Sequence, residues 1–211
     1  MPKSWRKEQK QDRYFQQAKK DGYRARSAYK LLELNDKFKL VRPGARILDL
    51  GAAPGSWSQV AAKVGQAARI VAVDLQPIQP LPGVQTIRAD ITKPETVTRI
   101  EELLPEGADL VLSDVAPAAS GVRLVDHARS IQLAEASLRI ALYFLKGGGA
   151  FVVKVFQGED FLGFVAQAKQ HFEMVRVFRP DASRKESDEH YVVCLQLQKG
   201  QTNLSAQNDA A

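Results

Sequence analysis

Three ionisable side chains stand out because each lies in or beside an apolar segment. Asp114 ends the segment LVLSD, Lys154 lies inside FVVKVF, and Glu189 opens the last apolar segment. Lysine is rarely buried without a partner, and grouped lysines and carboxylates are residue types that transfer protons. The alternative for Lys154 is a place near a strand end, from which its ammonium reaches water.

These side chains meet only if the strands that carry them are arranged in one particular way. The carboxyl ends of parallel strands share one edge of a sheet, which would bring Asp114 and Lys154 together. Glu189 reaches that edge if its strand is antiparallel, because an antiparallel strand begins where the others end. Lys30, on a predicted helix before the sheet, would then cover the group from above.

A second candidate site is the turn DLGAAPGSW, which spans residues 49–57 between an apolar stretch and a helical one. It is not a phosphate-binding P-loop, because no Gly-Lys-Ser/Thr follows, and it does not read GxGxxG. Gly51 and Gly55 allow its backbone to approach a ligand closely. The alternative is a tight strand-to-helix connection that binds nothing.

Two acidic residues follow this turn at the ends of the next two strands. Asp74 ends VAVD and can accept both hydroxyls of a ribose, whereas Asp90 in IRAD can accept from an adenine amino group. A glycine turn, a ribose acid and a second acid in this order predict an adenosine ligand such as S-adenosylmethionine. Asp90 can instead be a helix cap. NAD is an alternative ligand, because an acid that binds the ribose hydroxyls is also typical of NAD sites.

The elements that would position these groups alternate along the chain. Predicted strands cover residues 46–50, 69–74, 84–88, 108–113, 149–156, 174–178 and 191–198. Predicted helices cover residues 27–38, 56–64, 94–104, 126–145 and 160–171. This alternation predicts an α/β, Rossmann-like fold with a seven-stranded, mostly parallel sheet and helices on both faces. Residues 179–190 show no helical pattern between the last two strands, so one of the pair is predicted to be antiparallel.

Composition narrows the class of protein. The 211 residues are 45% hydrophobic, which suits one globular domain, and no apolar run is long enough to span a membrane. The start of the chain does not resemble a secretory signal. One cysteine, Cys194, fits a reducing cytoplasm. Metal-ligand spacing is absent among His127, His171 and His190, so we expect no metal site. We also expect the protein to be a cytoplasmic monomer.

The net charge of +6 is unevenly distributed. Residues 1–42 hold 13 basic and 5 acidic residues, a net +8, and the remainder carries −2. Several aromatic residues lie among these charges, namely Trp5, Tyr14, Phe15, Tyr23 and Tyr29. Basic side chains neutralise phosphates and aromatic rings stack on bases, which favours RNA binding. The alternative is a solvated helix whose aromatic rings pack on the domain.

We expect a basic arm over 1–22, a main domain over 23–199 and a disordered polar tail over 200–211.

Several segments together resemble the FtsJ/RrmJ type of ribose 2′-O-methyltransferase over about Ser27 to Gln198. They are SAYKLLEL, DLGAAPGSWSQ, AVDLQP, SDVAP, FVVKVFQG and SDEHYVV. The resemblance implies a catalytic tetrad of Lys30, Asp114, Lys154 and Glu189. It also implies cofactor contacts from Gly55, Trp57, Asp74, Asp90 and Asp114. One departure is Ser56, which replaces the second glycine of APGGW and is expected to cap the helix that follows.

The resemblance also implies a reaction. This is the S-adenosylmethionine-dependent methylation of a ribose 2′-hydroxyl in large-subunit (23S) ribosomal RNA, expected at a uridine of the assembled 50S subunit. A free lysine has a pKa of about 10.4, so a lysine that takes the hydroxyl proton must first be neutral. The alternatives are a transfer RNA 2′-O-methyltransferase, a non-catalytic RNA-binding module of the same fold, and an NAD oxidoreductase.

Overall fold

The computed structural model describes residues 12–67, 69–184, 187–198 and 200. The expectations for residues 1–11, including Trp5, and for residues 201–211 of the tail lie outside this part. The helices are α2 (Arg13–Lys20), α3 (Ala28–Phe38), α4 (Ser56–Gly65), α5 (Pro94–Leu103), α6 (Arg123–Phe144) and α7 (Phe161–Lys169). The strands are β1 (Arg46–Leu50), β2 (Arg69–Asp74), β3 (Val84–Arg88), β4 (Ala108–Ser113), β5 (Leu145–Phe156), β6 (Phe172–Phe178) and β7 (Glu189–Leu197).

The seven strands form one sheet in the order β3-β2-β1-β4-β5-β7-β6. Strand β7 lies between β5 and β6 and is antiparallel to both, whereas the other pairs are parallel. The predicted fold class is therefore confirmed, and the antiparallel strand is the last one. Strand β5 begins at Leu145, four residues before the prediction, because Leu145 pairs with Ala108 ahead of a register shift.

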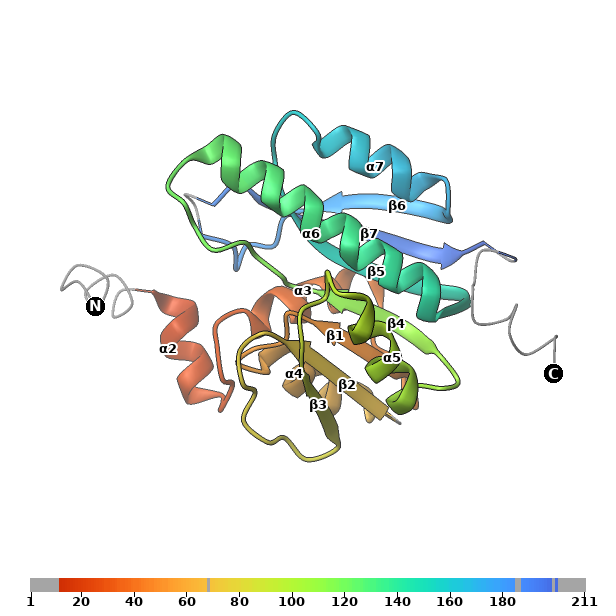
Figure 1. Cartoon of the computed structure of the whole chain (residues 1–211). Helices are drawn as coiled ribbons and strands as arrows, with labels where there is room; N and C mark the ends of the chain where they lie inside the picture. The colour runs from red at the N-terminus through yellow and green to blue at the C-terminus, as the bar shows by residue number, and fades with distance from the viewer. Residues whose placement is uncertain (1–11, 68, 185–186, 199, 201–211) are drawn as a thin grey trace.

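Helices cover both faces of the sheet (Figure 1). Helices α5, α6 and α7 pack on one face through a core that includes Ile100, Leu138 and Phe164. Helices α3 and α4 pack on the other face, where Leu31 and Val60 are fully buried. Side chains alternate along each strand, so neighbouring strand residues belong to different cores.

The central strands are buried on both faces, and the edge strands are not. Strand β1 is buried from Ile47 to Leu50, as expected for a parallel strand with helices above and below it. In edge strand β3 only Ile87 is buried, and edge strand β6 exposes Met174 and Val177. The central strands therefore form the buried interior of the domain.

The register of the parallel strands aligns the predicted site residues. Leu50 lies opposite both Val73 and Ser113, and Ser113 lies opposite Val153. These four residues form one row across β2, β1, β4 and β5. The next residue of each strand forms the following row, at the carboxyl edge: Asp74, Gly51, Asp114 and Lys154.

Candidate active site

Lys154 and Asp114 form a direct ion pair at the carboxyl edge of the sheet. Val152 belongs to the core beneath α3 and α4, and the alternation along β5 puts the Lys154 side chain on the same face. The Lys154 Nζ lies 2.9 Å from Asp114 Oδ1 and 2.6 Å from the Asp114 backbone oxygen. The lysine is 7% exposed. The alternative in which its ammonium reaches water is therefore wrong.

Lys30 and Glu189 form a second buried pair beside the first. The Lys30 Nζ lies 2.6 Å from Glu189 Oε1, and both residues are less than 10% exposed. Lys30 is carried by α3, outside the sheet, whereas Glu189 begins β7. Loss of one member of such a pair leaves an uncompensated buried charge, which costs about 3–5 kcal/mol. Each of the two lysines is thus held by its own carboxylate.

Tyr191 is a site residue that the sequence reasoning missed. It lies opposite Lys154 in the β5–β7 register, and its hydroxyl donates to Asp114 Oδ1 over 2.7 Å. The Lys30 Nζ lies 5.8 Å from the centre of its ring. Tyr191 therefore connects the two ion pairs. The sequence feature that could have indicated Tyr191 is its position two residues after Glu189, because residues two apart in a strand lie on the same face.

The electrostatics of the site fix the charge on Asp114. Burial alone would raise the pKa of Asp114, but the charges of Lys154 and Lys30 and the hydrogen bonds from Tyr191 and Lys154 outweigh it, so the pKa lies below its usual value. Burial, followed by the charges of Asp114 and Glu189, raises the pKa of Tyr191 well above its usual value. Asp114 is therefore an anion at neutral pH, and the tyrosine remains a hydrogen-bond donor.

The two glycines of the turn are required by contacts within the protein. Gly51 has φ +70°, and an added Cβ would lie 2.6 Å from the Val115 side chain and 2.8 Å from its backbone. Gly55 has φ +101°, and an added Cβ would lie 2.8 Å from Arg24 Nη1. Both values of φ favour glycine. The turn is thus a tight strand-to-helix connection, and the first backbone N–H groups of α4 have no side-chain caps.

Asp74 and Asp90 lie at the ends of β2 and β3 but have different roles in the fold. The Asp74 Oδ2 accepts the Ala53 N–H at 2.9 Å, which ties this carboxylate to the glycine turn. The Asp90 Oδ1 accepts from the Thr92 N–H and hydroxyl, and these hydrogen bonds lower the pKa of Asp90. Lys93, rather than Asp90, occupies the N-cap position of α5. Within the described residues, Asp90 Oδ2 has no hydrogen-bond partner, so one oxygen can receive a ligand.

Trp57 and Ser56 lie at the start of α4 and face the protein interior. The Trp57 ring is 2% exposed, donates from Nε1 to the Ser27 oxygen at 2.8 Å, and lies against Tyr191. A ligand at the turn can therefore contact Trp57 only through its backbone. The expectation that Ser56 caps the helix is wrong, because Gly55 is the N-cap residue and the Ser56 Oγ lies 2.7 Å from Ser27 Oγ.

Arg24 joins the segment before α3 to the glycine turn. Its guanidinium donates to the Pro54 oxygen at 2.9 Å and to the Gln79 and Pro80 oxygens at 2.8 Å each. The segment after β2 is thereby held next to the turn. These contacts connect the N-terminal region to the part of the site that the sequence assigns to an adenosine ligand.

Asp49 lies under the turn, near the end of β1, and is fully buried. Its Oδ2 accepts from the Ser58 hydroxyl at 2.6 Å, whereas its Oδ1 has no partner. Burial raises the pKa of Asp49 to about 7, and the neighbouring charges of Asp114 and Asp74 act in the same direction. This carboxyl therefore titrates near neutral pH, although no sequence signal distinguished it from its neighbours.

The described part of the basic arm packs on the domain. Helix α2 is capped by Asp12, which also pairs with Arg26. The ring centres of Tyr14 and Tyr23 lie 5.5 and 5.9 Å from that of Tyr29. Tyr14, Tyr23 and Tyr29 thus follow the packing alternative. The arm also presents exposed cations such as Lys19 and Lys20.

The described part of the chain contains neither a cluster of metal ligands nor a helix that could span a membrane. In that part of the chain, no group of three or more His, Cys, Asp or Glu residues could hold a metal ion. Across the same residues, no helix combines the length and apolar character that crossing a membrane requires.

A Rossmann-like sheet whose last strand is antiparallel, with a glycine turn and acids along its carboxyl edge, defines a methyltransferase. The chain belongs to the FtsJ-like methyltransferase family, whose model matches residues 23–197.

Comparison with individual proteins agrees with this assignment. The chain is 53% identical over 190 residues to a "Ribosomal RNA large subunit methyltransferase E" of Archaeoglobus fulgidus, which covers 90% of this chain and 98% of that protein. It is 48% identical to the protein of the same name from Azoarcus sp., over 92% and 96% of the two chains. The crystal structure of a ribosomal RNA methyltransferase from Plasmodium falciparum matches with a TM-score of 0.75 at 28% identity, over 83% and 98% of the chains.

Proposed function

We propose that this protein transfers a methyl group from S-adenosylmethionine to a ribose 2′-hydroxyl of large-subunit ribosomal RNA. The observation that carries the proposal is the buried Lys154, held against Asp114 at the carboxyl edge where the glycine turn also lies. A lysine base at this position suits a hydroxyl, which must lose its proton as it attacks. The names of the relatives, large-subunit ribosomal RNA methyltransferases, support the substrate class.

The residues at the edge fit S-adenosylmethionine. Asp74 and Asp90 each present a carboxylate at a strand end, and one oxygen of Asp90 is without a partner in the described structure. The first turn of α4 presents backbone N–H groups beside Gly55, where the carboxylate of an amino acid is bound favourably. Bound S-adenosylmethionine supplies an electrophilic methyl group on a positively charged sulfonium. Gly51, Gly55, Asp74, Asp90, Asp114 and the Trp57 backbone would hold it.

The hydrogen bonds of Lys154 suit a base that accepts a single proton. In the ion pair with Asp114, Lys154 is protonated, so it must release one proton to solvent before it can act as a base. The neutral amine then has two N–H donors and one lone pair. Two acceptors are already in place, the Asp114 backbone oxygen and Asp114 Oδ1, so both donors are used and the lone pair is left for the ribose hydroxyl. Asp114 then stabilises the ammonium that forms. Tyr191 holds Asp114 in this orientation through its hydroxyl.

Lys30 and Glu189 have a positioning role in this scheme. The pair closes the site from the α3 side and puts a second cation near Asp114 and Tyr191. That cation stabilises the negative charge of Asp114 and keeps this carboxylate ionised.

The finer parts of the proposal concern the RNA. We assign the methylation to a uridine of 23S ribosomal RNA within the assembled 50S subunit, in a cytoplasmic reaction that needs no metal and only one copy of the chain. The net charge of +8 in residues 1–42 supports an RNA substrate with many phosphates.

Mapping of 2′-O-methyl groups in cellular RNA, with and without the gene, tests the proposal directly. One 23S uridine should lose its methyl group and regain it when the purified protein and S-adenosylmethionine are added to 50S subunits from the deletion strain. A site lost from transfer RNA would indicate the transfer RNA alternative. Unchanged maps, together with RNA binding, would indicate a non-catalytic module.

A further inference from the structure

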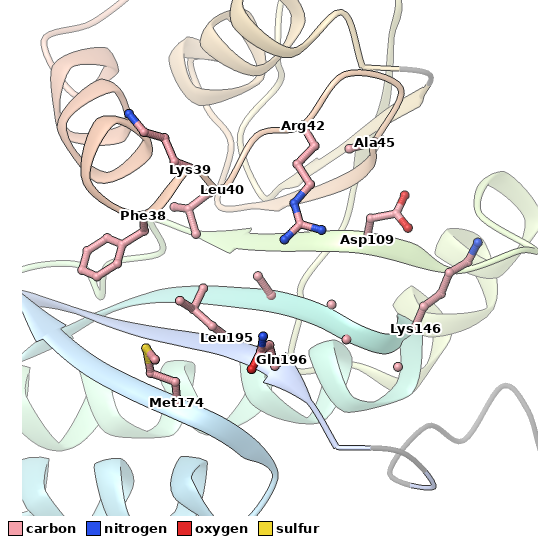
Figure 2. A pocket seen from close by; sticks show the side chains of 14 residues that line it. Phe38, Lys39, Leu40, Arg42, Ala45, Asp109, Lys146, Met174, Leu195 and Gln196 are labelled. Carbon is pink, nitrogen blue, oxygen red and sulfur yellow. The ribbon is translucent and has the colours of Figure 1, made fainter.

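A cavity lies at the amino edge of the sheet, opposite the edge that carries the candidate active site (Figure 2). It has a volume of about 230 Å³, and a water molecule takes up about 30 Å³, so it can hold a group much larger than one water. Its walls come from the end of α3 and the segment after it, the beginnings of β4, β5 and β6, and the end of β7. None of the site residues described above lines it.

One side of the cavity carries cations without partners. Within the described residues, Arg42 and Lys146 form no hydrogen bond through their side chains and no ion pair, and Arg42 points across the cavity toward Leu195 and Gln196 (Figure 2). The acid of the lining, Asp109, already accepts from the Arg46 backbone N–H at 2.8 Å, and its Oδ2 lies 3.7 Å from Arg46 Nε. The lining therefore has positive charge available for an anion.

The other side of the cavity is apolar. Phe38, Leu40 and Leu195 line it, together with Met174, which is 40% exposed. An apolar wall of this kind can cover the face of a base. A phosphate and a base next to each other form a nucleotide, and the two sides of the cavity match these two parts.

The backbone around the cavity is unusual as well. Gln196 lies near the end of β7 with φ +62°, a conformation that few residues other than glycine adopt, and its side chain lines the cavity. Gly148 has φ +79°, and no other atom lies within 4 Å of the position that a Cβ would take. The backbone itself therefore forms this part of the wall, and the space beside it is open. Such strained positions cluster at binding sites.

We propose that this cavity binds a nucleotide of the RNA substrate outside the catalytic edge, an inference that rests on the proposed function. Arg42 and Lys146 contact the phosphate, and Met174 and Leu195 contact the base. Strands of five to six residues separate the two edges by roughly 17–20 Å. A stacked RNA strand rises about 3.4 Å per nucleotide, so the bound nucleotide lies at least about five or six nucleotides from the target ribose.

A matched pair of double variants tests this proposal. Arg42→Ala/Lys146→Ala removes the cavity cations, and Arg139→Ala/Lys169→Ala removes one arginine and one lysine from exposed positions on α6 and α7, on the other face. Binding of a fluorescent 20-nucleotide single-stranded RNA is measured from 50 to 200 mM salt. The cavity variant should bind about tenfold more weakly, and its log–log salt slope should fall by about 0.7, because both cations contact a single phosphate. The control should keep the slope of the unmodified protein.

Equal losses in both double variants would overturn the proposal, because net charge alone would then explain them, and so would an unchanged cavity variant. The charge-preserving variant Arg42→Lys/Lys146→Arg should restore most of the affinity, and thermal unfolding of all variants checks the fold. RNA with 4-thiouridine should crosslink to the segment that contains Met174. Methyl transfer by the unmodified protein is assayed separately, so failure of the proposed function and failure of this inference are distinguishable.

Discussion

The two edges of the sheet use charge in opposite ways. At the carboxyl edge, Lys154 and Lys30 are buried, and each lies within 3 Å of a carboxylate oxygen. At the amino edge, Arg42 is exposed, and neither it nor Lys146 has a polar partner among the described residues. Both edges are built by the ends of the same strands. The difference is therefore set by the residues at those ends and not by the fold.

This difference in charge matches the two tasks proposed above, proton transfer at the carboxyl edge and RNA binding at the amino edge. A proton transfer needs donor and acceptor atoms in fixed positions, and buried ion pairs with defined hydrogen bonds hold them there. A contact with RNA phosphate needs a cation that is still free to displace counterions. The predictions below change one edge at a time, so that chemistry and binding respond separately.

The largest effect is expected at the carboxyl edge. Lys154→Ala removes the proposed base, and the single-turnover rate of methyl transfer should fall by a factor of about 10²–10⁴ or more, with RNA and cofactor affinities nearly unchanged. Lys154→Arg should not restore the rate, because a guanidinium remains protonated. Rapid-quench assays at saturating substrates give the rate. A near-normal rate in the arginine variant would leave Lys154 with a positioning role only.

A smaller effect is expected for the acid that follows β2. Asp74→Ala should weaken S-adenosylmethionine binding about 10- to 100-fold, because the hydrogen bonds of a charged group contribute about 1.5–3 kcal/mol. Calorimetry on a variant that unfolds at a similar temperature measures this affinity. RNA affinity serves as the control, since Asp74 lies away from the amino edge. Unchanged affinity for the cofactor would exclude the assigned ribose contact.

Removal of residues 1–21 tests whether the basic arm contacts RNA phosphates, as proposed for the amino edge of the sheet. The segment holds seven lysines and arginines, and its loss should weaken RNA binding about fivefold to tenfold and flatten the salt dependence. Arg24 remains, so affinity for S-adenosylmethionine should be preserved. An identical salt slope for the shortened chain, measured by fluorescence anisotropy, would show that the arm does not contact phosphates.

At Asp49, which lies under the glycine turn near the end of β1, the expected effect is on the pH dependence of stability. Its pKa is raised to about 7, so the folded state holds a proton that the unfolded state releases near pH 4. The stability that this proton provides is complete below pH 4 and is lost as the pH rises to about 7. Asp49→Asn should therefore flatten the decline in the free energy of unfolding between pH 5 and 8. Urea titrations at both pH values measure it, and a parallel decline in both proteins would contradict the prediction.

The sequence was sufficient to predict those features of the fold and the site that depend on local patterns of residues. Alternating strands and helices indicated the sheet, and Asp114 and Lys154 could be brought together because both lie at the carboxyl ends of predicted strands. Tyr191 was missed because its role depends on the pairing of β7 with β5, across 37 residues of chain. Ser56 was misread because its partner, Ser27, belongs to a segment that only the folded chain brings near.

The cavity at the amino edge could not have been predicted at all. Arg42 and Lys146 are 104 residues apart in the sequence, and each alone resembles an ordinary surface cation. Only the sheet order brings the beginning of β5 next to the end of β7 and so closes the wall between them.

The position of β7 has a consequence for synthesis of the protein. The ribosome makes the chain from its N-terminus, so the glycine turn and the acids after it can fold while the rest of the chain is still being made. Glu189 and Tyr191 arrive last, on a strand that must insert between two strands already present. A nascent chain that stops before this strand can hold its adenosine-binding half and yet lack both groups that position Lys30 and Asp114. Under the proposed mechanism, methyl transfer is therefore expected only after β7 has been made and inserted.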